Sequence, residues 1–290
     1  MREPARGFSP RRRFGQNFLV NEGAIDSLIA AFRPGPADRV LEIGPGRGAL
    51  TRRLLGQVGQ LTAIEVDRDL VAFLRQSFPV TAANPAALRL IEADVLQLNL
   101  GTILEEMGAT PAEPARVIAN LPYNIATAVI LMLLPERPLL RDLLVMVQRE
   151  VAERIMARPG TRSYGGLSVL TQAAVRAESI LRLRPGSFRP MPKVHSEAIL
   201  LRPRPPGQGI AAGESARLSQ LARHAFAHRR KTLLNNLRHL PGSADGSPLG
   251  LERAETLIRG AGLDPGARPE QVPVSGYLTL LQAWRPPAAL

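Results

Sequence analysis

A strand followed directly by a glycine-rich turn constrains the fold of this chain more than any other feature. Residues 38–43 have the length and the apolar core of a buried strand, and Gly44-Pro45-Gly46-Arg47-Gly48 follows at once. Glycine lets the backbone turn tightly and lets a ligand approach it, and helix-favouring residues come next. The N–H groups that begin such a helix attract an anion, so we expect an anionic group to dock here. The turn also fits a dinucleotide fingerprint if Ala49 replaces the third glycine, so it leaves a nicotinamide enzyme and a methyltransferase equally open.

Two further predicted strands, 60–64 and 88–91, end in acidic residues. Glu65 follows the first at about the twenty-residue interval expected of an acid that binds ribose hydroxyls. Asp94 follows the second and can accept an adenine amino hydrogen. Each acid alone fits a solvated loop better, but the ordered set predicts a ligand that carries adenosine.

A polar and aromatic cluster, Asn120-Leu121-Pro122-Tyr123, ends the apolar run 116–119. It combines an amide, chain carbonyls and a ring at the carboxyl end of a predicted strand, where ligands bind in open α/β sheets. This composition indicates a pocket for a planar amine. The alternative is a Pro-Tyr turn that only caps the strand.

Together these motifs resemble the S-adenosylmethionine-dependent ribosomal RNA adenine dimethyltransferases of the KsgA type, which modify small-subunit RNA. The resemblance covers nearly the whole chain, and its motifs are at 14–19, 42–48, 120–123, 188–194 and 229–233. It implies a Rossmann-like class I methyltransferase sheet, mostly parallel with an antiparallel edge strand, and a small C-terminal all-helical domain. It also implies S-adenosyl-L-methionine as cofactor, held by Gln16, Asn17, Leu19, Glu42, Gly44, Gly46, Glu65, Asp94, Val95 and Asn120. His195 departs from the family pattern, which usually has Asp there, and this puts in doubt the local contact that the acid makes.

The chemistry of the second motif can be argued from its residue types. Adenine N6 is a weak nucleophile because its lone pair is delocalised, so a catalyst should accept the amino hydrogens and aim the lone pair at the donor's methyl group. Asn120 Oδ1 and the Leu121 carbonyl suit this task, and Pro122 keeps that carbonyl extended. Tyr123 would stack on the base. Phe188 is a candidate second stacking face, although such a Phe also suits a hydrophobic plug.

The net charge of +12 and the isoelectric point near 11.3 favour an anionic macromolecule as partner. Residues 1–20 hold five arginines and one glutamate and are predicted to grip RNA phosphates; the alternative is a solvated tail. Only two of the 37 basic residues are lysines, and both fall inside the family-like motifs. The residues predicted to bind RNA are Arg11, Arg12, Arg13, Lys193, Arg223, Arg229, Arg230 and Lys231.

The predicted domains are a basic arm at 1–20, a catalytic domain at 21–204 and a helical RNA-binding domain at 205–290. The Pro/Gly-rich stretch 202–209 marks the boundary between the last two. Two strands near 178–184 and 195–202 are expected at an antiparallel edge of the sheet. Helical patterns follow near 214–227, 229–240, 250–261 and 270–284.

The absence of cysteine excludes disulfides and cysteine-ligated metals and is compatible with a reducing cytoplasm. No stretch approaches membrane-spanning length, so we expect a soluble, cytoplasmic monomer without a membrane partner. His224 and His228 have helical spacing, but there is no third ligand nearby, so no metal site is predicted.

The leading functional hypothesis is dimethylation of N6 of two adjacent adenosines in the 3′-terminal hairpin of small-subunit (16S) rRNA during ribosome assembly. The partner would be the immature small subunit. One alternative is the resistance-conferring adenine N6-methyltransferase of large-subunit RNA, which shares the donor and adenine motifs. Another is a ribosome-assembly factor that only binds, against which the intact Asn120, Glu65 and Asp94 argue. Nicotinamide-dependent oxidation comes last, because no residue set suited to hydride transfer is present.

Overall fold

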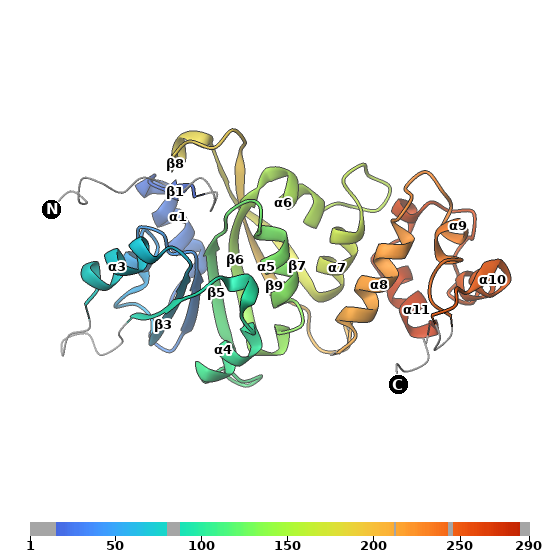
Figure 1. Cartoon of the computed structure of the whole chain (residues 1–290), viewed down its shortest axis with the longest axis horizontal. Helices are drawn as coiled ribbons and strands as arrows, with labels where there is room; N and C mark the ends of the chain where they lie inside the picture. The colour runs from blue at the N-terminus through green and yellow to red at the C-terminus, as the bar shows by residue number, and fades with distance from the viewer. Residues whose placement is uncertain (1–15, 80–87, 212, 243–245, 285–290) are drawn as a thin grey trace. The chain divides into compact units, whose positions relative to one another are not determined.

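A seven-stranded sheet is the centre of the computed structural model, which describes residues 16–79, 88–211, 213–242 and 246–284 (Figure 1). The strand order is β4-β3-β2-β5-β6-β9-β7. The strands are β2 (Arg39–Ile43), β3 (Gln60–Glu65), β4 (Leu88–Glu92), β5 (Ala115–Asn120), β6 (Leu140–Gln148), β7 (Val175–Leu183) and β9 (Ser196–Pro203). Strands β4 to β6 pair in parallel, and β9 pairs antiparallel with β6. The predicted fold class, including the antiparallel edge, is confirmed.

The chain changes direction in the sheet between β2 and β5. From β2 it proceeds outward through β3 and β4 on one side, and then returns to build β5 and β6 on the other. Neighbouring connections therefore leave the carboxyl ends of β2 and β5 in opposite directions. A crevice forms at such a switch point, and it is where open α/β sheets bind ligands.

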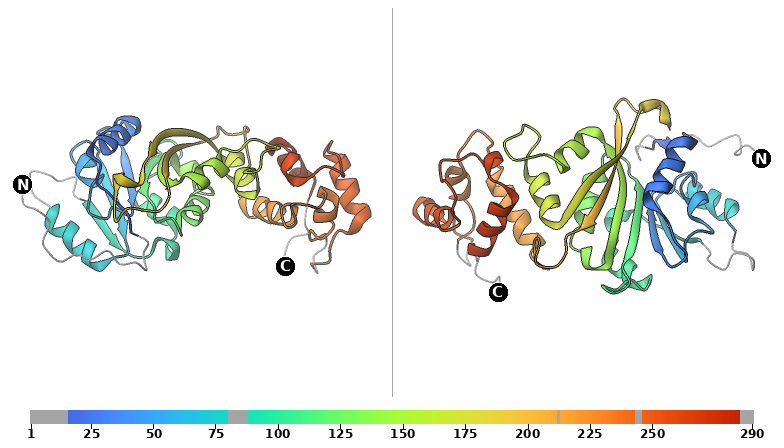
Figure 2. Two further views of the ribbon diagram at one scale, coloured as in Figure 1. Left: turned by 90° about the horizontal axis from the view of Figure 1, so that it is seen from above. Right: turned by 180° about the vertical axis from the view of Figure 1, so that it is seen from behind.

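Both faces of the central strands are buried, which explains why their sequences are nearly continuous apolar runs. Along β2 and β5, Val40 and Ile118 pack in a core cluster with Ile25 and Leu28 of helix α1 (Glu22–Phe32). Side chains alternate along a strand, so the next residues point to the opposite face. Helix α1 lies over one face of the sheet (Figure 2, right), and α4 (Leu100–Glu106) and α5 (Ala126–Leu133) lie over the other (Figure 1). Each fully buried Leu or Ile contributes about 1.5–3 kcal/mol to folding.

A short second sheet brings the N-terminal part of the chain to the edge of the crevice. Strand β1 (Phe18–Leu19) pairs antiparallel with β8 (Phe188–Arg189). The Val20 N–H extends the pairing by donating to Ser187 O at 2.9 Å. Residues 16–19 are thereby held beside strands that are distant in sequence.

The region after the glycine turn differs from the sequence prediction. Helix α2 contains only Thr51–Leu54, and residues 46–50 form turns before it. Leu50, at its N-cap, makes no side-chain capping hydrogen bond, and Leu55 has already left the helical region with ψ of 129°. A four-residue helix has almost no macrodipole, so it adds little to the attraction for an anion that we expected at the start of a helix here.

The chain divides into two compact units. The first contains Met1–Ala152 and Glu178–Pro203, and the second contains Glu153–Ala177 and Arg204–Leu290. The division after Pro203 lies in the Pro/Gly-rich stretch, but the second unit also includes 153–177, which the sequence analysis places in the catalytic domain. The reason is packing, because helix α7 (Gly166–Ala174) contacts α8 (Ser215–Ala225) and α11 (Val274–Ala283) of the C-terminal segment.

The second unit is helical, as predicted. After α7 it contains α8 (Ser215–Ala225), α9 (Leu233–Leu237), α10 (Gly250–Gly260) and α11 (Val274–Ala283). Tyr164, Phe226 and Tyr277 form its aromatic core, with ring centroids 6.2 and 5.6 Å apart. The two tyrosine hydroxyls donate to backbone carbonyls, Val272 O at 3.0 Å and Pro269 O at 2.8 Å, so neither is left unsatisfied. Throughout the described part of the chain, no helix is both long and apolar enough to span a bilayer.

Candidate active site

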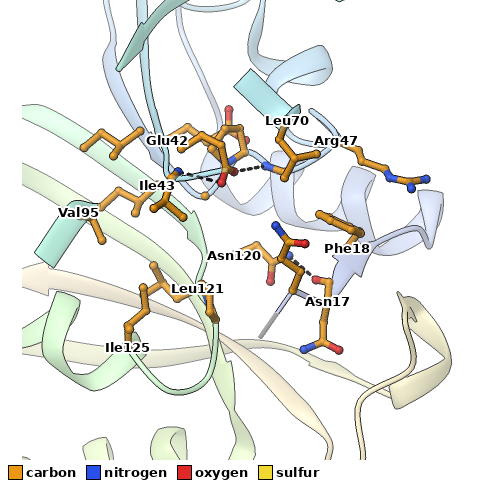
Figure 3. Close-up of a pocket in the computed structure, with 18 of the residues that line it drawn as sticks. Asn17, Phe18, Glu42, Ile43, Arg47, Leu70, Val95, Asn120, Leu121 and Ile125 are labelled. Carbon is orange, nitrogen blue, oxygen red and sulfur yellow. Dashed lines mark hydrogen bonds between the residues drawn. The ribbon is translucent and has the colours of Figure 1, made fainter. Parts of the chain in front are cut away.

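A pocket opens at the switch point of the sheet, and its walls come from the ends of β2, β3, β4 and β5 together with residues 16–19 (Figure 3). It brings together almost all of the residues that the sequence analysis selected for the donor and the adenine. These are Gln16, Asn17, Leu19, Glu42, Gly44, Gly46, Glu65, Asp94, Val95, Asn120, Leu121, Pro122 and Tyr123. All lie within the first unit. The structure thus places these residues around one pocket, and their individual roles are predicted from the sequence.

The glycine turn forms the floor between β2 and β5. Gly44 has φ of 71°, and a Cβ built on it would lie 3.3 Å from Asn120 O. Gly46 has φ of 57°, and a Cβ there would lie 2.9 Å from the Phe18 ring. Both positions combine a left-handed backbone with a close neighbour, so any side chain there would push the turn away from β5 or from β1.

Glu65, at the end of β3, is held by three backbone N–H groups. Its Oε1 accepts from Val66 and Asp67 at 3.0 Å each, and its Oε2 accepts from Gly46 at 3.2 Å. Burial nevertheless raises its pKa, against these hydrogen bonds. Because a carboxylate has about four acceptor sites, only one remains, on Oε2. Simultaneous acceptance of both ribose hydroxyls, expected from the sequence, therefore requires one of these N–H groups to give way.

Asp67 is a structural partner that the sequence reasoning missed. It is fully buried, caps helix α3 (Arg68–Ser77) by accepting from the Asp69 N–H at 3.1 Å, and accepts from Gln16 Nε2 at 2.9 Å. Gln16 thus fastens the segment before β1 to the helix that follows β3. The pattern of an Asp directly before a helix was the signal that could have found it.

Glu42 lies at the bottom of the pocket, 1% exposed. Thr51 Oγ1 donates to its Oε2 at 2.7 Å. Burial raises the pKa of Glu42 to about 7, the hydrogen bonds from Thr51 oppose this, and neighbouring Glu65 adds to it. Within the described part of the chain neither glutamate forms a salt bridge, so a cationic ligand in the pocket would favour their charged forms.

Asp94 and Val95 form the wall beyond β4. Asp94 is exposed and begins the short 3₁₀ turn Val95–Gln97, where its Oδ1 accepts from the Leu96 N–H at 3.0 Å. Val95 is buried, and Figure 3 shows it on the same side as Leu121 and Ile125. The combination of a carboxylate at the rim and apolar side chains inside suits a flat heterocycle with an amino group.

Asn120 has a fixed amide orientation. Its Nδ2 donates to Asn17 O at 3.1 Å, as the dashed line in Figure 3 shows. One of the two Nδ2 hydrogens is therefore used by the backbone of the N-terminal segment, and this contact assigns Oδ1 to the other side of the amide, where it can accept from a ligand. An oriented acceptor in a pocket is what the predicted binding of an adenine amino group requires.

Tyr123 is half-buried in the loop after β5, and its ring is tethered at the far end. Its hydroxyl lies 2.7 Å from Ser196 Oγ, the first residue of β9. Ser196 is 1% exposed. The sequence reasoning did not find Ser196, although it lies two residues after the family-like motif 188–194.

Phe188 is not placed as a stacking face. It is 1% exposed and belongs to the hydrophobic core cluster with Leu19 and Leu28. It does not line the pocket formed by the described residues. Of the two interpretations offered by the sequence, the hydrophobic plug agrees with the structure, because pairing of β8 with β1 turns this ring into the core.

Phe18 is the aromatic residue that the pocket contains instead. Its ring lies against Gly46 and beneath Arg47, whose guanidinium carbon is 5.2 Å from the ring centroid (Figure 3). This cation–π contact covers the glycine turn and puts a positive charge at the rim. The sequence analysis gave Phe18 no role, although it lies within the family-like motif 14–19.

The residues predicted to bind RNA fall into three groups. Arg11, Arg12 and Arg13 lie outside the described residues. Lys193, Arg223, Arg230 and Lys231 are exposed. Arg229 donates through Nη2 to Arg162 O at 2.8 Å and to Tyr164 O at 3.1 Å, so it fastens a loop of the second unit.

The Arg-Arg-Lys motif lies in the turn between α8 and α9, and not on the helix that the sequence analysis expected from 229. Thr232 caps α9 by accepting from the Asn235 N–H at 3.3 Å. His228 also lies beyond the end of α8, so it does not share a helix face with His224. His224 Nδ1 instead lies 2.9 Å from Gln220 O.

Comparison with known proteins decides between the enzyme classes that the glycine turn left open. The sequence profile of the family described as ribosomal RNA adenine dimethylase matches residues 7–247. This chain belongs to that family. The nicotinamide alternative is thereby excluded.

Relatives named "Ribosomal RNA small subunit methyltransferase A" match this chain over almost its full length. The protein from Acidithiobacillus ferrooxidans is 38% identical over 273 residues, covering 94% of each chain. That from Synechococcus elongatus is 40% identical over 275 residues, covering 93% of each.

Two solved structures of similar fold cover both units of this family member. A dimethyladenosine transferase from Plasmodium falciparum has a TM-score of 0.69 at 24% identity and covers 91% of this chain and 96% of its own. The 23S rRNA methyltransferase ErmE has a TM-score of 0.63 at 25% identity and covers 92% and 99%. The fold is shared by both kinds of enzyme, so fold alone does not separate their RNA substrates.

Proposed function

We propose that this protein is an S-adenosylmethionine-dependent methyltransferase that converts two adjacent adenosines in the 3′-terminal hairpin of small-subunit (16S) rRNA to N6,N6-dimethyladenosine during ribosome assembly. The observation that carries the proposal is the oriented amide of Asn120 at the switch point of the sheet. Membership of the adenine dimethylase family and relatives named as small-subunit methyltransferases support the substrate class.

The pocket residues fit the methyl donor, which would supply an electrophilic methyl group on a sulfonium. Gly44 and Gly46 leave space for it where side chains would fill the floor. Glu65 keeps one acceptor site for a ribose hydroxyl, and Asp94 has a carboxylate at the rim for an adenine amino group. The negative character of Glu42 and Glu65 complements a cation.

The chain's own contribution to transfer is to orient the target amine. Asn120 Oδ1 and the Leu121 carbonyl accept its two hydrogens, which localises the nitrogen lone pair and aims it at the methyl carbon. The nitrogen–carbon bond forms as the sulfur–carbon bond breaks, and sulfur keeps the electron pair. The nitrogen, now cationic, then releases a proton to water, so no charged general base is required. Tyr123 forms a wall of the base pocket.

The partner in this proposal is the immature small subunit, met by a cytoplasmic monomer. The net charge of +12 and the exposed Lys193, Arg223, Arg230 and Lys231 support binding to an RNA phosphate backbone. The predicted arm at 1–20 and helical domain at 205–290 would each add contacts with RNA phosphates.

Radiolabelled methyl donor given separately with unmethylated small subunits, large subunits and naked rRNA tests the proposal. We expect label only on small-subunit RNA, as dimethyladenosine at two neighbouring positions in the 3′-terminal hairpin. Label confined to large-subunit RNA would identify the resistance-type activity instead. Binding without any label would identify an assembly factor that lacks transfer.

A further inference from the structure

The contact between Tyr123 and Ser196 joins a loop residue to the first residue of a strand. Ser196 begins β9 and lies opposite Gln148 in the antiparallel register with β6. The carbonyl of the preceding residue, His195, accepts from the Arg149 N–H at 3.0 Å. The backbone beneath the serine hydroxyl is therefore fixed by the sheet.

Tyr123 itself lies in a loop, where a ring is not fixed by a strand ladder. The first residues of α5 fix the loop's course, since Ile125 and Ala126 both donate to Pro122 O at 3.1 Å. They do not fix the ring's far edge. The 2.7 Å contact with Ser196 Oγ does, because it holds the hydroxyl at a defined place beyond the end of β6.

The tyrosine hydroxyl serves here as an anchor. Burial raises the pKa of Tyr123, and the Ser196 hydrogen bond only partly opposes this. The phenol therefore stays protonated at neutral pH and supplies no base. Its role is to keep the ring in place, so the consequence of losing the contact should be geometric.

The two successive methyl transfers to one nitrogen depend on the position of the Tyr123 ring to different extents. An unmodified adenine amine offers two hydrogens, which Asn120 Oδ1 and the Leu121 carbonyl can both hold. After the first transfer only one hydrogen is left. The orientation of the monomethylated base then depends more on the pocket wall, and the Tyr123 ring is that wall.

We propose that Ser196 is a positioning residue whose hydroxyl fixes the Tyr123 ring and thereby supports the second methyl transfer more than the first. This inference rests on the proposed function and adds to it a determinant of product: monomethyl or dimethyl adenosine. Ser196 acts through Tyr123 and has no contact with the reacting atoms in this scheme.

The experiment uses the full-length protein with unmethylated small subunits and with subunits that already carry N6-monomethyladenosine at the target. Single-turnover rates and the ratio of monomethyl to dimethyl product are measured. For Ser196→Ala we expect the second transfer to slow about tenfold, the equivalent of one lost hydrogen bond, and the first to slow less than about threefold. Monomethyladenosine should accumulate, and donor affinity should not change.

Tyr123→Phe removes the same hydrogen bond from the other side and serves as the second variant if Ser196→Ala does not fold. It should give the same product ratio, and the double variant should add no further loss.

Thr62→Val is the matched control. It removes a fully buried hydroxyl from the same sheet, and Thr62 Oγ1 has no hydrogen-bond partner among the described residues, so both transfer rates should equal those of the unaltered protein.

Equal slowing of both transfers, an unchanged product ratio, or additive losses in the double variant would each overturn the inference while leaving the proposed function intact. If the unaltered protein forms no dimethyladenosine on any RNA, the proposed function fails first and the inference fails with it. The two failures are thus distinguished by the unaltered protein alone.

Discussion

At the amino ends of β2, β5 and β6 a buried cation is surrounded by anions, whereas at the carboxyl ends of β2 and β3 the buried Glu42 and Glu65 form no salt bridge within the described residues. Arg116 binds Asp142 with two hydrogen bonds of 2.7 Å and Asp38 with one of 2.8 Å, and it also donates to Arg33 O at 3.0 Å. Its guanidinium further lies 3.9 Å from the centroid of the Phe32 ring.

Glu42 and Glu65 at the other edge are held only by hydroxyl and backbone N–H groups. A buried charge whose hydrogen-bond and ion-pair partners are all within the protein stabilises the fold and cannot bind a ligand. A buried charge with unfilled acceptor sites lowers the stability but can still bind one. The amino ends of the central strands therefore stabilise the fold, and the carboxyl ends keep acceptor groups for binding a ligand.

The largest effect is expected from breaking the closed network. Arg116→Met should lower the free energy of unfolding by about 3–5 kcal/mol, because Asp38 and Asp142 would remain buried without their cation. Urea denaturation followed by circular dichroism measures this. Arg39→Met is the matched control, since its salt bridge to Glu113 is largely exposed and should be worth about 1 kcal/mol or less. Equal losses of unfolding free energy in the two variants would show that the buried network contributes no more than an exposed salt bridge.

Asn120→Ala tests the opposite end and should affect chemistry instead of stability. We expect the rate of methyl transfer to fall about 10²–10³-fold, the usual result of removing one oriented polar group, with RNA affinity retained. Single-turnover kinetics and filter binding separate the two quantities. Asn99→Ala, which removes an exposed helix cap outside the pocket lining, is a control expected to keep the transfer rate. Unchanged turnover in Asn120→Ala would remove the amide from the mechanism.

The pH dependence of stability should have opposite signs at the two edges. Burial alone would raise the pKa of Asp38, but hydrogen bonds from Arg116 and the Gly35 N–H outweigh it and the pKa is lowered, so this edge loses stability as pH falls below about 4. Glu42 has the reverse sign. With its pKa raised to about 7, the folded protein holds a proton that the unfolded chain releases above pH 4.5, so stability falls as pH rises between these values.

Glu42→Gln should therefore stabilise the ligand-free protein at pH 8, by about 3 kcal/mol at most, and give no gain near pH 4.5. Thermal unfolding across this pH range measures it. Glu92→Gln, at an exposed position at the end of β4, is the control for the substitution itself and should leave the unfolding temperature close to that of the unaltered protein. A Glu42→Gln gain that does not depend on pH would contradict the ionisation argument.

The smallest effect concerns two buried threonines with opposite surroundings. Thr62→Val should raise the free energy of unfolding by about 1 kcal/mol, because Thr62 Oγ1 has no partner in the described part of the structure. Thr51→Val should lower it, since Thr51 Oγ1 donates to Glu42. Chemical denaturation of both variants gives the two signs, and a loss in Thr62→Val would point to a partner for its hydroxyl.

The sequence predicted the strands and their ends well because each is an apolar run stopped by glycine or a polar residue. Since the carboxyl ends of parallel strands meet at one edge, it also placed Gly44, Glu65, Asp94 and Asn120 in one pocket. These inferences need only local periodicity and the geometry of a parallel sheet.

The failures share a different cause, which is contact between segments remote in sequence. Phe188 turns into the core because β8 pairs with β1, and Arg229 is occupied by the carbonyls of residues 162 and 164. Ser196 meets Tyr123 only across β6. None of these pairings leaves a periodic signal in either segment, so the local sequence could not reveal them.

The pairing of β1 with β8 also bears on the order in which the molecule is built. Asn17, which orients Asn120, and Phe18, which covers the glycine turn, leave the ribosome early, but β8 is made only after the parallel strands β2 to β6. During synthesis this wall of the pocket therefore cannot form until β8 has been made. A nascent chain released before residue 189 would hold the parallel strands β2 to β6 without β9 and without a finished site, so activity is acquired late in translation.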